Sequence, residues 1–252
     1  MIPSLTAAPA WQSVGVDDHA VAAGLAAEAG RLLVEIRAQG GAAGDKQSNE
    51  LLLRRLAEVR PDDAVLSEES ADDGTRVRHE RVWIVDPLDG TREYGEPPRE
   101  DWAVHVALAL DGVAAVGAVA LPAAGLVLHT GEPPVVPARE PGPIRLAVSR
   151  TRPPAAVDHL VRHLDAALVP MGSAGAKAMA VVRGEVDVYA HSGGQYEWDS
   201  CAPVAVAAAA GLHVSRLDGS PLRYNQPDPY LPDLLICRPE FAGPVLESLA
   251  TA

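Results

Sequence analysis

The chain is organised around one stretch of ten residues, Val82-Trp83-Ile84-Val85-Asp86-Pro87-Leu88-Asp89-Gly90-Thr91. Its four leading apolar residues are typical of a buried strand. Pro87 has no backbone N–H to donate, so the pattern predicts that the strand ends at Asp86. Gly90 permits a tight turn, and Thr91 is suited to begin a helix whose first backbone N–H groups are free.

This turn brings two carboxylates and several amide donors to one place. Carboxylate oxygens such as those of Asp86 and Asp89 are preferred ligands of Mg²⁺, and free amides near a helix start can bind phosphate. A metal beside a phosphate predicts phosphoryl chemistry. Asp-Pro and Asp-Gly pairs are also ordinary turn signals. The buried strand before them and the acids elsewhere in the chain favour a functional site.

The composition is that of a globular protein and excludes several kinds of partner. The chain has 252 residues, of which 48% are hydrophobic but only 4% aromatic, so alanine, valine and leucine must fill the core. This length fits one large domain or two small ones. The net charge of −13 argues against nucleic acid and against an anionic membrane surface as partners. A small phosphorylated substrate is compatible, because bound cations reverse the local field.

The two cysteines and the apolar segments indicate a cytoplasmic protein. Cys201 and Cys237 are too few for a disulfide framework, and they form no zinc-binding pair. Residues 1–10 lack the charged and apolar regions of a signal peptide. No apolar run is long enough for a membrane span.

The first half contains two predicted helices and a second acidic pair. Apolar residues at helical spacing predict helices over residues 17–37 and 45–59. The glycine-rich residues 40–44 predict a flexible loop, and Asp45 is either an N-cap or a site residue. A short strand over 64–67 ends in Glu68-Glu69, which offers metal ligands or belongs to a solvated loop.

Strands and a linker follow the central stretch. Alternating apolar residues predict antiparallel strands over 102–110, 113–121 and 126–130. The proline-rich residues 132–143 are typical of a linker or exposed loop. We therefore expect one domain over 1–252, built from subdomains 1–143 and 144–252.

The second half alternates strands with helices, which predicts α/β layers. Strands are expected over 144–148, 167–170, 186–190, 213–215 and 234–237. Helices are expected over 154–164, from the Gly172–Lys177 segment onward, over 197–210, and from residue 240 onward. The segment Gly172–Lys177 has the wrong spacing for a Walker loop, and it is either an anion site or a tight strand-to-helix turn. Asp199 is either an N-cap or a ligand.

Three acidic blocks together resemble the signature of the inositol monophosphatase superfamily. These blocks are Glu68-Glu69-Ser70, the stretch 86–91, and Trp198-Asp199. Four later blocks are most similar to those of CysQ-type 3′(2′),5′-bisphosphate nucleotidases: 172–177, 184–189, 197–199 and 218–222. The resemblance covers the chain from about residue 17 onward.

The resemblance implies a fold and an activity. The implied fold is the layered αβαβα sandwich of the inositol monophosphatase and fructose-1,6-bisphosphatase type. The implied enzyme is a Mg²⁺-dependent, lithium-sensitive phosphatase that converts 3′-phosphoadenosine 5′-phosphate (PAP) to AMP, with a role in sulfate assimilation. It would use two or three Mg²⁺ ions and a small phosphorylated substrate, and a homodimer is compatible with the resemblance.

The resemblance also implies roles for individual residues. The metal ligands would be Glu68, Asp86, the Leu88 carbonyl, Asp89 and Asp199. The catalytic residues would be Asp45, Glu68 and Thr91. The substrate would contact Gly90, Thr91, Ser173, Lys177 and Arg152. Carboxylates about 4 Å apart repel each other by about 4 kcal/mol at an effective dielectric near 20, so such a cluster requires cations. Oxygen ligands without Cys or His favour Mg²⁺ over zinc.

The sequence departs from the family pattern at three places. Residues 40–44 replace a Lys-x-Asp…Pro-Val-Thr-x-x-Asp segment, of which only Asp45 matches the final Asp. Arg152 stands where related sequences often have histidine, and the 172–177 segment is one residue longer than usual. Lys177 is the first candidate to bind a second phosphate, and Arg152 is the second candidate.

Three other functions are compatible with parts of this sequence pattern. Haloacid dehalogenase phosphatases use Asp-x-Asp-Gly-Thr with a covalent aspartate, but the acids here are three positions apart. A non-catalytic metal-binding regulator is disfavoured because every expected ligand is present. A phosphatase for inositol phosphate or fructose bisphosphate is the remaining alternative, because the same core serves all of these substrates.

Overall fold

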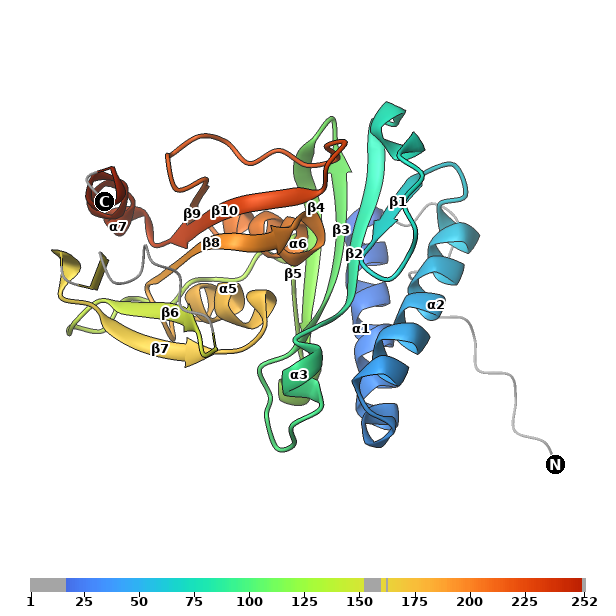
Figure 1. Ribbon diagram of the computed structural model, residues 1–252, viewed down its shortest axis with the longest axis horizontal. Coiled ribbons are helices and arrows are strands. Elements are labelled where there is room, and N and C mark those ends of the chain that lie inside the picture. Colours follow the sequence, from blue (N-terminus) through green and yellow to red (C-terminus); the bar gives the residue numbers. More distant parts are fainter. Residues whose placement is uncertain (1–16, 152–159, 162, 251–252) are drawn as a thin grey trace.

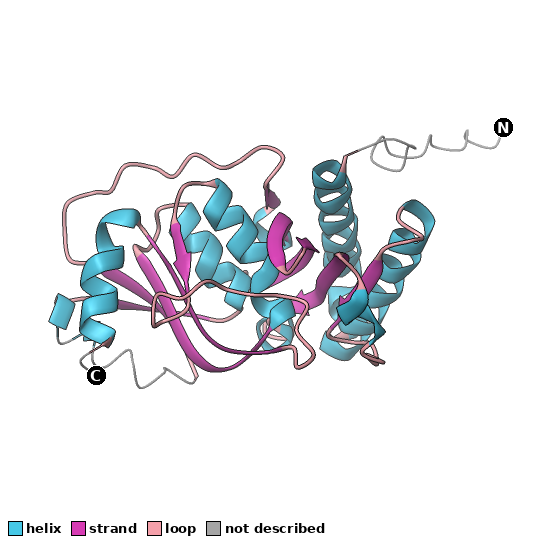
Figure 2. Ribbon diagram, turned by 90° about the horizontal axis from the view of Figure 1, so that it is seen from above, coloured by secondary structure: helices cyan, strands magenta, loops and turns pink. Residues whose placement is uncertain are grey.

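The computed structural model describes residues 17–151, 160–161 and 163–250, and these residues form five alternating layers of helices and sheets. Figure 1 shows the N-terminal helices at one end and the C-terminal helix at the other, with two sheets and a central pair of helices between them. The same separation of the two helical ends is visible from above in Figure 2. The predicted αβαβα sandwich is confirmed.

The outer layer at the N-terminal end consists of helices α1 (Asp18–Ile36) and α2 (Gly41–Val59), joined by the short 3₁₀ helix η2 (Arg37–Gln39). Asp17 caps α1, because its side chain accepts a hydrogen bond from the Ala20 amide. The predicted loop over 40–44 is wrong, because residues 41–44 are the first turn of α2 and Gly40 precedes that turn with φ 87°.

The glycines of this turn serve close packing rather than flexibility. A Cβ on Gly41 would lie 2.5 Å from the Thr91 methyl carbon, and one on Gly44 would lie 3.0 Å from a Leu88 methyl carbon. The start of α2 can therefore approach the central stretch, and Asp45 lies inside the helix instead of capping it.

The first sheet has the strand order β1-β2-β3-β4-β5. Its strands are β1 (Ala64–Ser67), β2 (Arg81–Asp89), β3 (Ala103–Leu110), β4 (Val113–Leu121) and β5 (Leu126–His129). Strand β1 runs parallel to β2, and the other neighbours are antiparallel. The short elements α3 (Thr91–Tyr94), η3 (Thr75–Arg78) and η4 (Pro122–Ala124) lie in its connections.

The two faces of this sheet carry side chains of different size. On β3, the larger residues Val104, Val106 and Leu108 pack with Trp83 in the core beneath α1 and α2. The opposite face presents small residues such as Ala107 to the central helices. Period-two alternation of large and small side chains therefore decides which helix layer each face receives.

The central layer consists of α5 (Ala174–Val182) and α6 (Glu197–Ala209). Helix α6 contacts β2, β3 and β4 on one side and β8, β9 and β10 on the other. Its run of Ala and Val residues permits close packing, and a Cβ on Gly117 of β4 would lie 2.7 Å from the backbone oxygen of Ala202. Cys201 is fully buried there.

The second sheet has the strand order β7-β6-β8-β10-β9. Its strands are β6 (Arg145–Ser149), β7 (Ala167–Met171), β8 (Val188–Tyr196), β9 (His213–Ser215) and β10 (Tyr230–Cys237). Strand β8 is longer than predicted, because Gly193 and Gly194 form a bulge inside it rather than a loop. Helix α7 (Pro239–Leu249) covers the outer face. Most of the predicted helix over 154–164 lies outside the described residues.

Candidate active site

A bulge in β2 points both aspartates of the central stretch toward the same side of the sheet. The register pairs Asp86 with His105 and Asp89 with Ala103, so two β2 residues lie opposite one β3 residue. Leu88 therefore packs in the core under α1 and α2, while Asp89 faces the start of α5. The prediction that Pro87 ends the strand is wrong, because the strand continues through this bulge to Asp89.

Three carboxylates from two distant segments converge beside this bulge. Carboxylate oxygens of Asp86, Asp89 and Asp199 all lie within 4.8 Å of one another, which is a spacing that could hold a metal ion. Asp199 comes from the first turn of α6. Glu68 follows the end of β1, and its carboxylate lies beside Asp86 at a more exposed position. The hard oxygen donors fit Mg²⁺.

The charges of these carboxylates oppose one another. Loss of solvent and repulsion from Asp199 raise the pKa of Glu68 to about 7. Burial and repulsion from Asp89 raise the pKa of Asp199 to about 7. Burial, followed by repulsion from Glu68, raises the pKa of Asp86 well above its ordinary value. A bound divalent cation would relieve this repulsion, and the donor set therefore fits a metal centre.

Asp89 is the exception, because hydrogen bonds hold it in the charged form. Its carboxylate accepts hydrogen bonds from the Ser173 hydroxyl at 2.5 Å and from the Gly175 amide at 2.6 Å. His105 Nε2 lies 3.2 Å from Asp89 Oδ2. Burial raises the pKa of Asp89, but the hydrogen bonds from His105, Ser173 and Gly175 outweigh it and lower the pKa to about 2.

His105 contacts Asp89 and the backbone next to Asp199, a positioning role that the sequence pattern does not reveal. The ring is completely buried, and Nδ1 lies 3.0 Å from the backbone carbonyl of Trp198. One imidazole thus connects β2, through Asp89, with the segment that carries Asp199. The alternation of β3 indicates only that His105 faces the side of the small residues.

Thr91 and Asp45 form a second polar group beside the cluster. Thr91 Oγ1 lies 3.3 Å from Asp45 Oδ1 and 3.2 Å from the Leu88 carbonyl oxygen, so its single proton can be donated to either acceptor. Burial and repulsion from Glu69 raise the pKa of Asp45 to about 6, despite the hydrogen bond from Thr91. The Ser48 hydroxyl donates to the Pro87 carbonyl at 2.8 Å and ties α2 to the bulge.

A cavity of about 280 Å³ opens next to the cluster. Its lining includes Asp89, Gly90, Thr91, Ser173, Lys177 and Asp199, so most of the sequence-predicted site residues meet there. Asp45 adjoins it through Thr91, whereas Glu68 lies beside Asp86 and neither of these two residues lines the cavity. Arg152 lies outside the described residues.

Two of the expected substrate contacts are engaged within the protein. The Ser173 hydroxyl donates to Asp89 and accepts from the Ala176 amide at 2.9 Å, as the N-cap of α5. Lys177 is only 5% exposed, and its Nζ donates to the carbonyls of Gly172 and Ser173. Both residues therefore shape the turn that carries Asp89's partners.

Comparison with known proteins places this site in a family. The sequence pattern described as "Inositol monophosphatase family" matches residues 37–242, which is more than half of the chain. The chain belongs to this family. The family consists of Mg²⁺-dependent phosphatases, which agrees with an acidic cluster that could hold a metal ion. The resemblance seen in the acidic blocks is confirmed, and the haloacid dehalogenase alternative is excluded.

Individual family members are similar over most of the chain. The 3′-phosphoadenosine 5′-phosphate phosphatase of Mycobacterium tuberculosis is 55% identical over 241 residues, which cover 89% of this chain and 90% of that protein. The 3′(2′),5′-bisphosphate nucleotidase CysQ of Escherichia coli (strain K12) is 30% identical over 201 residues, covering 75% of this chain and 81% of that protein.

The fold of the family is also found among solved structures. The inositol monophosphatase from Anabaena (Nostoc) has a TM-score of 0.77 and 26% identity, with 93% of this chain and 95% of that chain covered. A CysQ structure from Bacteroides thetaiotaomicron has a TM-score of 0.73 and covers 86% of this chain and 95% of that chain. In the part of this chain that the structure describes, every helix is too short or too polar to cross a bilayer.

Proposed function

We propose that this chain removes the 3′-phosphate of PAP and releases AMP and phosphate, using Mg²⁺ held by the acidic cluster. The main support is a cluster of three carboxylates, two of them buried, in a chain that is 55% identical to a PAP phosphatase over 89% of its length. CysQ from E. coli is a 3′(2′),5′-bisphosphate nucleotidase, and its similarity to this chain supports the same substrate class. Lithium sensitivity is expected as a family trait.

In this proposal the metal ligands are Glu68, Asp86, the Leu88 carbonyl, Asp89 and Asp199. Two or three Mg²⁺ ions bound there would lower the pKa of the attacking water and stabilise the negative charge of the leaving oxygen. Asp89 enters this set already ionised, because Ser173 and the α5 amides hold its charge. The Asp89 carboxylate would therefore be charged and correctly oriented before the metal binds.

The protein's own groups position the reactants. When the Thr91 hydroxyl donates its hydrogen bond to Asp45, the Thr91 oxygen is free to accept a hydrogen bond from the attacking water. Gly90 and Thr91 line the cavity, where their amides would contact the phosphate that is cleaved. Because the pKa of Asp45 is raised to about 6, this carboxylate gains or loses its proton close to neutral pH.

The two halves of the chain would act as subdomains 1–143 and 144–252 of a single phosphatase domain. Glu68, Asp86 and Asp89 belong to the first half, and Asp199 and Ser173 belong to the second. The hydrogen bond from Ser173 to Asp89 joins the halves at the cluster. Each subdomain would therefore contribute part of the metal site, and neither would be active alone.

A substrate comparison tests the proposal. We expect kcat/KM for PAP to exceed that for inositol 1-phosphate by about 100-fold or more, because two phosphates offer a second charge-assisted contact worth roughly 1.5–3 kcal/mol in addition to contacts with the base. Phosphate release would be measured for both substrates in Mg²⁺ buffer, and the nucleotide product identified chromatographically. A preference for inositol 1-phosphate would refute the nucleotidase assignment and favour the inositol monophosphatase alternative.

A further inference from the structure

Three cationic side chains line the described part of the cavity beside the acidic cluster: Arg92, Arg150 and Lys177. A bisphosphate substrate whose 3′-phosphate lies at the cluster still carries a second phosphate. That second phosphate needs a cation whose charge and donors are not already used inside the protein.

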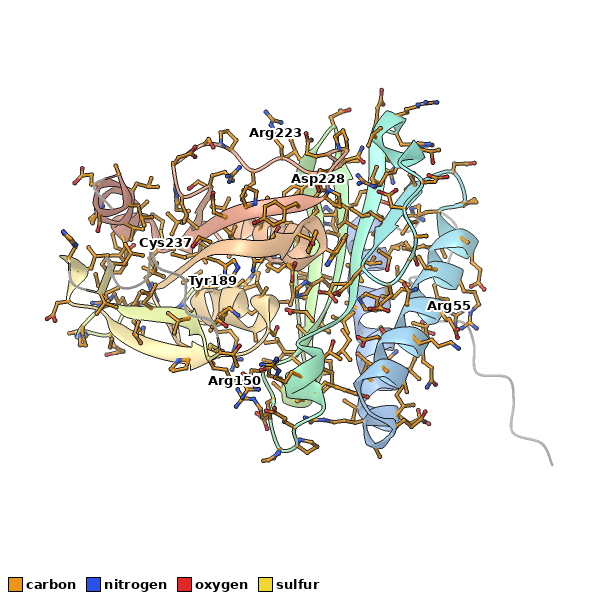
Figure 3. The ribbon with its side chains drawn as sticks, in the orientation of Figure 1. Arg55, Arg150, Tyr189, Arg223, Asp228 and Cys237 are labelled. Carbon is orange, nitrogen blue, oxygen red and sulfur yellow. The ribbon has the colours of Figure 1, made fainter. Side chains whose placement is uncertain are left out.

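Arg150 does not meet this requirement. Its Nε donates to Glu93 Oε1 at 2.7 Å, and its Nη2 donates to Glu96 Oε2 at 2.8 Å. Two carboxylates face one guanidinium, so the three side chains together carry a net charge of −1. Figure 3 shows Arg150 beside α3, where this group fixes the wall of the cavity.

Lys177 is also committed to the protein. The residue is 5% exposed, and its ammonium donates to two carbonyls of the preceding turn and lies 5.4 Å from the centre of the Tyr189 ring. Since an ammonium has three N–H groups, at most one remains for a ligand. Lys177 adds positive charge to the cavity, but most of its hydrogen-bonding capacity holds the turn before α5.

Arg92 has neither restriction. It is exposed, lines the cavity, and follows Thr91 directly in α3. Within the described residues no carboxylate or carbonyl engages its guanidinium. Its planar group offers two parallel N–H donors to a phosphate, a geometry that lysine cannot reproduce. Among the three described cations of the cavity, it alone has a charge that no carboxylate faces and N–H donors that no group of the protein already uses.

We propose that Arg92 binds the phosphate of the substrate that is not cleaved, and thereby sets the preference for a bisphosphate nucleotide over a monophosphate. The inference rests on the proposed function, because it requires a substrate with two phosphates. It assigns Arg92 to substrate binding, and it assigns Lys177 mainly to the turn before α5.

Replacement of Arg92 by glutamine tests this role. PAP carries both phosphates, whereas 3′-AMP carries only the one that is cleaved, so their ratio of kcat/KM isolates the second phosphate. We expect Arg92→Gln to lower this ratio by about 10- to 100-fold, through a higher KM for PAP. Arg92→Lys keeps the charge but not the planar fork, and it should restore the ratio only in part.

Arg223→Gln is the matched control. Arg223 is another exposed arginine, it lies away from the cavity, and Figure 3 shows it at the opposite edge of the molecule from Arg150. This variant should keep the wild-type ratio, and melting temperatures would verify that all variants are folded. If wild type releases no phosphate from PAP, the proposed function fails and this inference falls with it. If wild type hydrolyses PAP but does not prefer it to 3′-AMP, only the role of Arg92 is overturned. If wild type prefers PAP and Arg92→Gln keeps that preference, only the role of Arg92 is overturned.

Discussion

Replacement of Asp86 by asparagine is expected to lower kcat for phosphate release by at least about 1,000-fold. Asp86 is 1% exposed and lies at the centre of the cluster, with Glu68 and Asp199 as charged neighbours. An amide removes a full negative charge from the metal ligands, and metal ions contribute several kcal/mol of transition-state stabilisation. Since about 1.4 kcal/mol corresponds to a tenfold change in rate, a loss of this size follows.

The same variant separates loss of metal binding from loss of the fold. Asp86 is repelled by its neighbours in the metal-free protein, so the neutral side chain should leave the metal-free melting temperature unchanged or higher. Mg²⁺ at about 100 times its Kd should stabilise wild type by about 2.7 kcal/mol, and this stabilisation should be absent in Asp86→Asn. Asp62→Asn, at an exposed position outside the cluster, is the matched control. Near-wild-type turnover in Asp86→Asn would remove Asp86 from the ligand set.

Removal of the Thr91 hydroxyl is expected to lower kcat by about 100-fold or more, which is the usual range for groups that transfer or orient a proton. Thr91 Oγ1 lies 3.3 Å from Asp45 Oδ1, and no other contact of this hydroxyl reaches a carboxylate in the described residues. KM should change little in Thr91→Ala, because the hydroxyl acts on the attacking water rather than on substrate binding.

Thr91→Ser provides the comparison for this prediction. Serine keeps the hydroxyl and loses only the methyl group that packs against Gly41. We expect Thr91→Ser to recover most of the wild-type kcat under saturating substrate. An unchanged kcat in Thr91→Ala, or an equally low kcat in both variants, would show that the hydroxyl has no part in turnover.

The layers of the fold could be predicted from local patterns, whereas two details of the central region could not. Alternation along residues 102–110 predicts the strand and also which side chains share a face, because both follow from the period of two. The bulge at Pro87 depends on pairing with β3, which a single strand does not reveal. The glycine-rich residues 40–44 suggest flexibility locally, but Gly41 and Gly44 are required by the close approach of Thr91 and Leu88, which are distant in sequence.

The site residues show the same division between local and long-range information. The acidic blocks identify Asp86, Asp89 and Asp199 as candidate ligands, and the structure brings these three together. The sequence also places Lys177 near a phosphate, but it cannot show that the ammonium bonds to the carbonyls of its own turn. The contact of His105 with Asp89 becomes visible only once β2 and β3 are paired.

Hydrolysis of PAP by the acidic cluster is expected to depend entirely on bound Mg²⁺. The most direct test is phosphate release from PAP by wild-type protein, measured before chelation with EDTA, after removal of metal and chelator, and after return of Mg²⁺. Metal content would be determined on the same samples. We predict no release above background from the metal-free protein and full recovery with Mg²⁺, with AMP as the nucleotide product. Undiminished release of phosphate by protein shown to be free of metal would mean that the acidic cluster does not act through Mg²⁺.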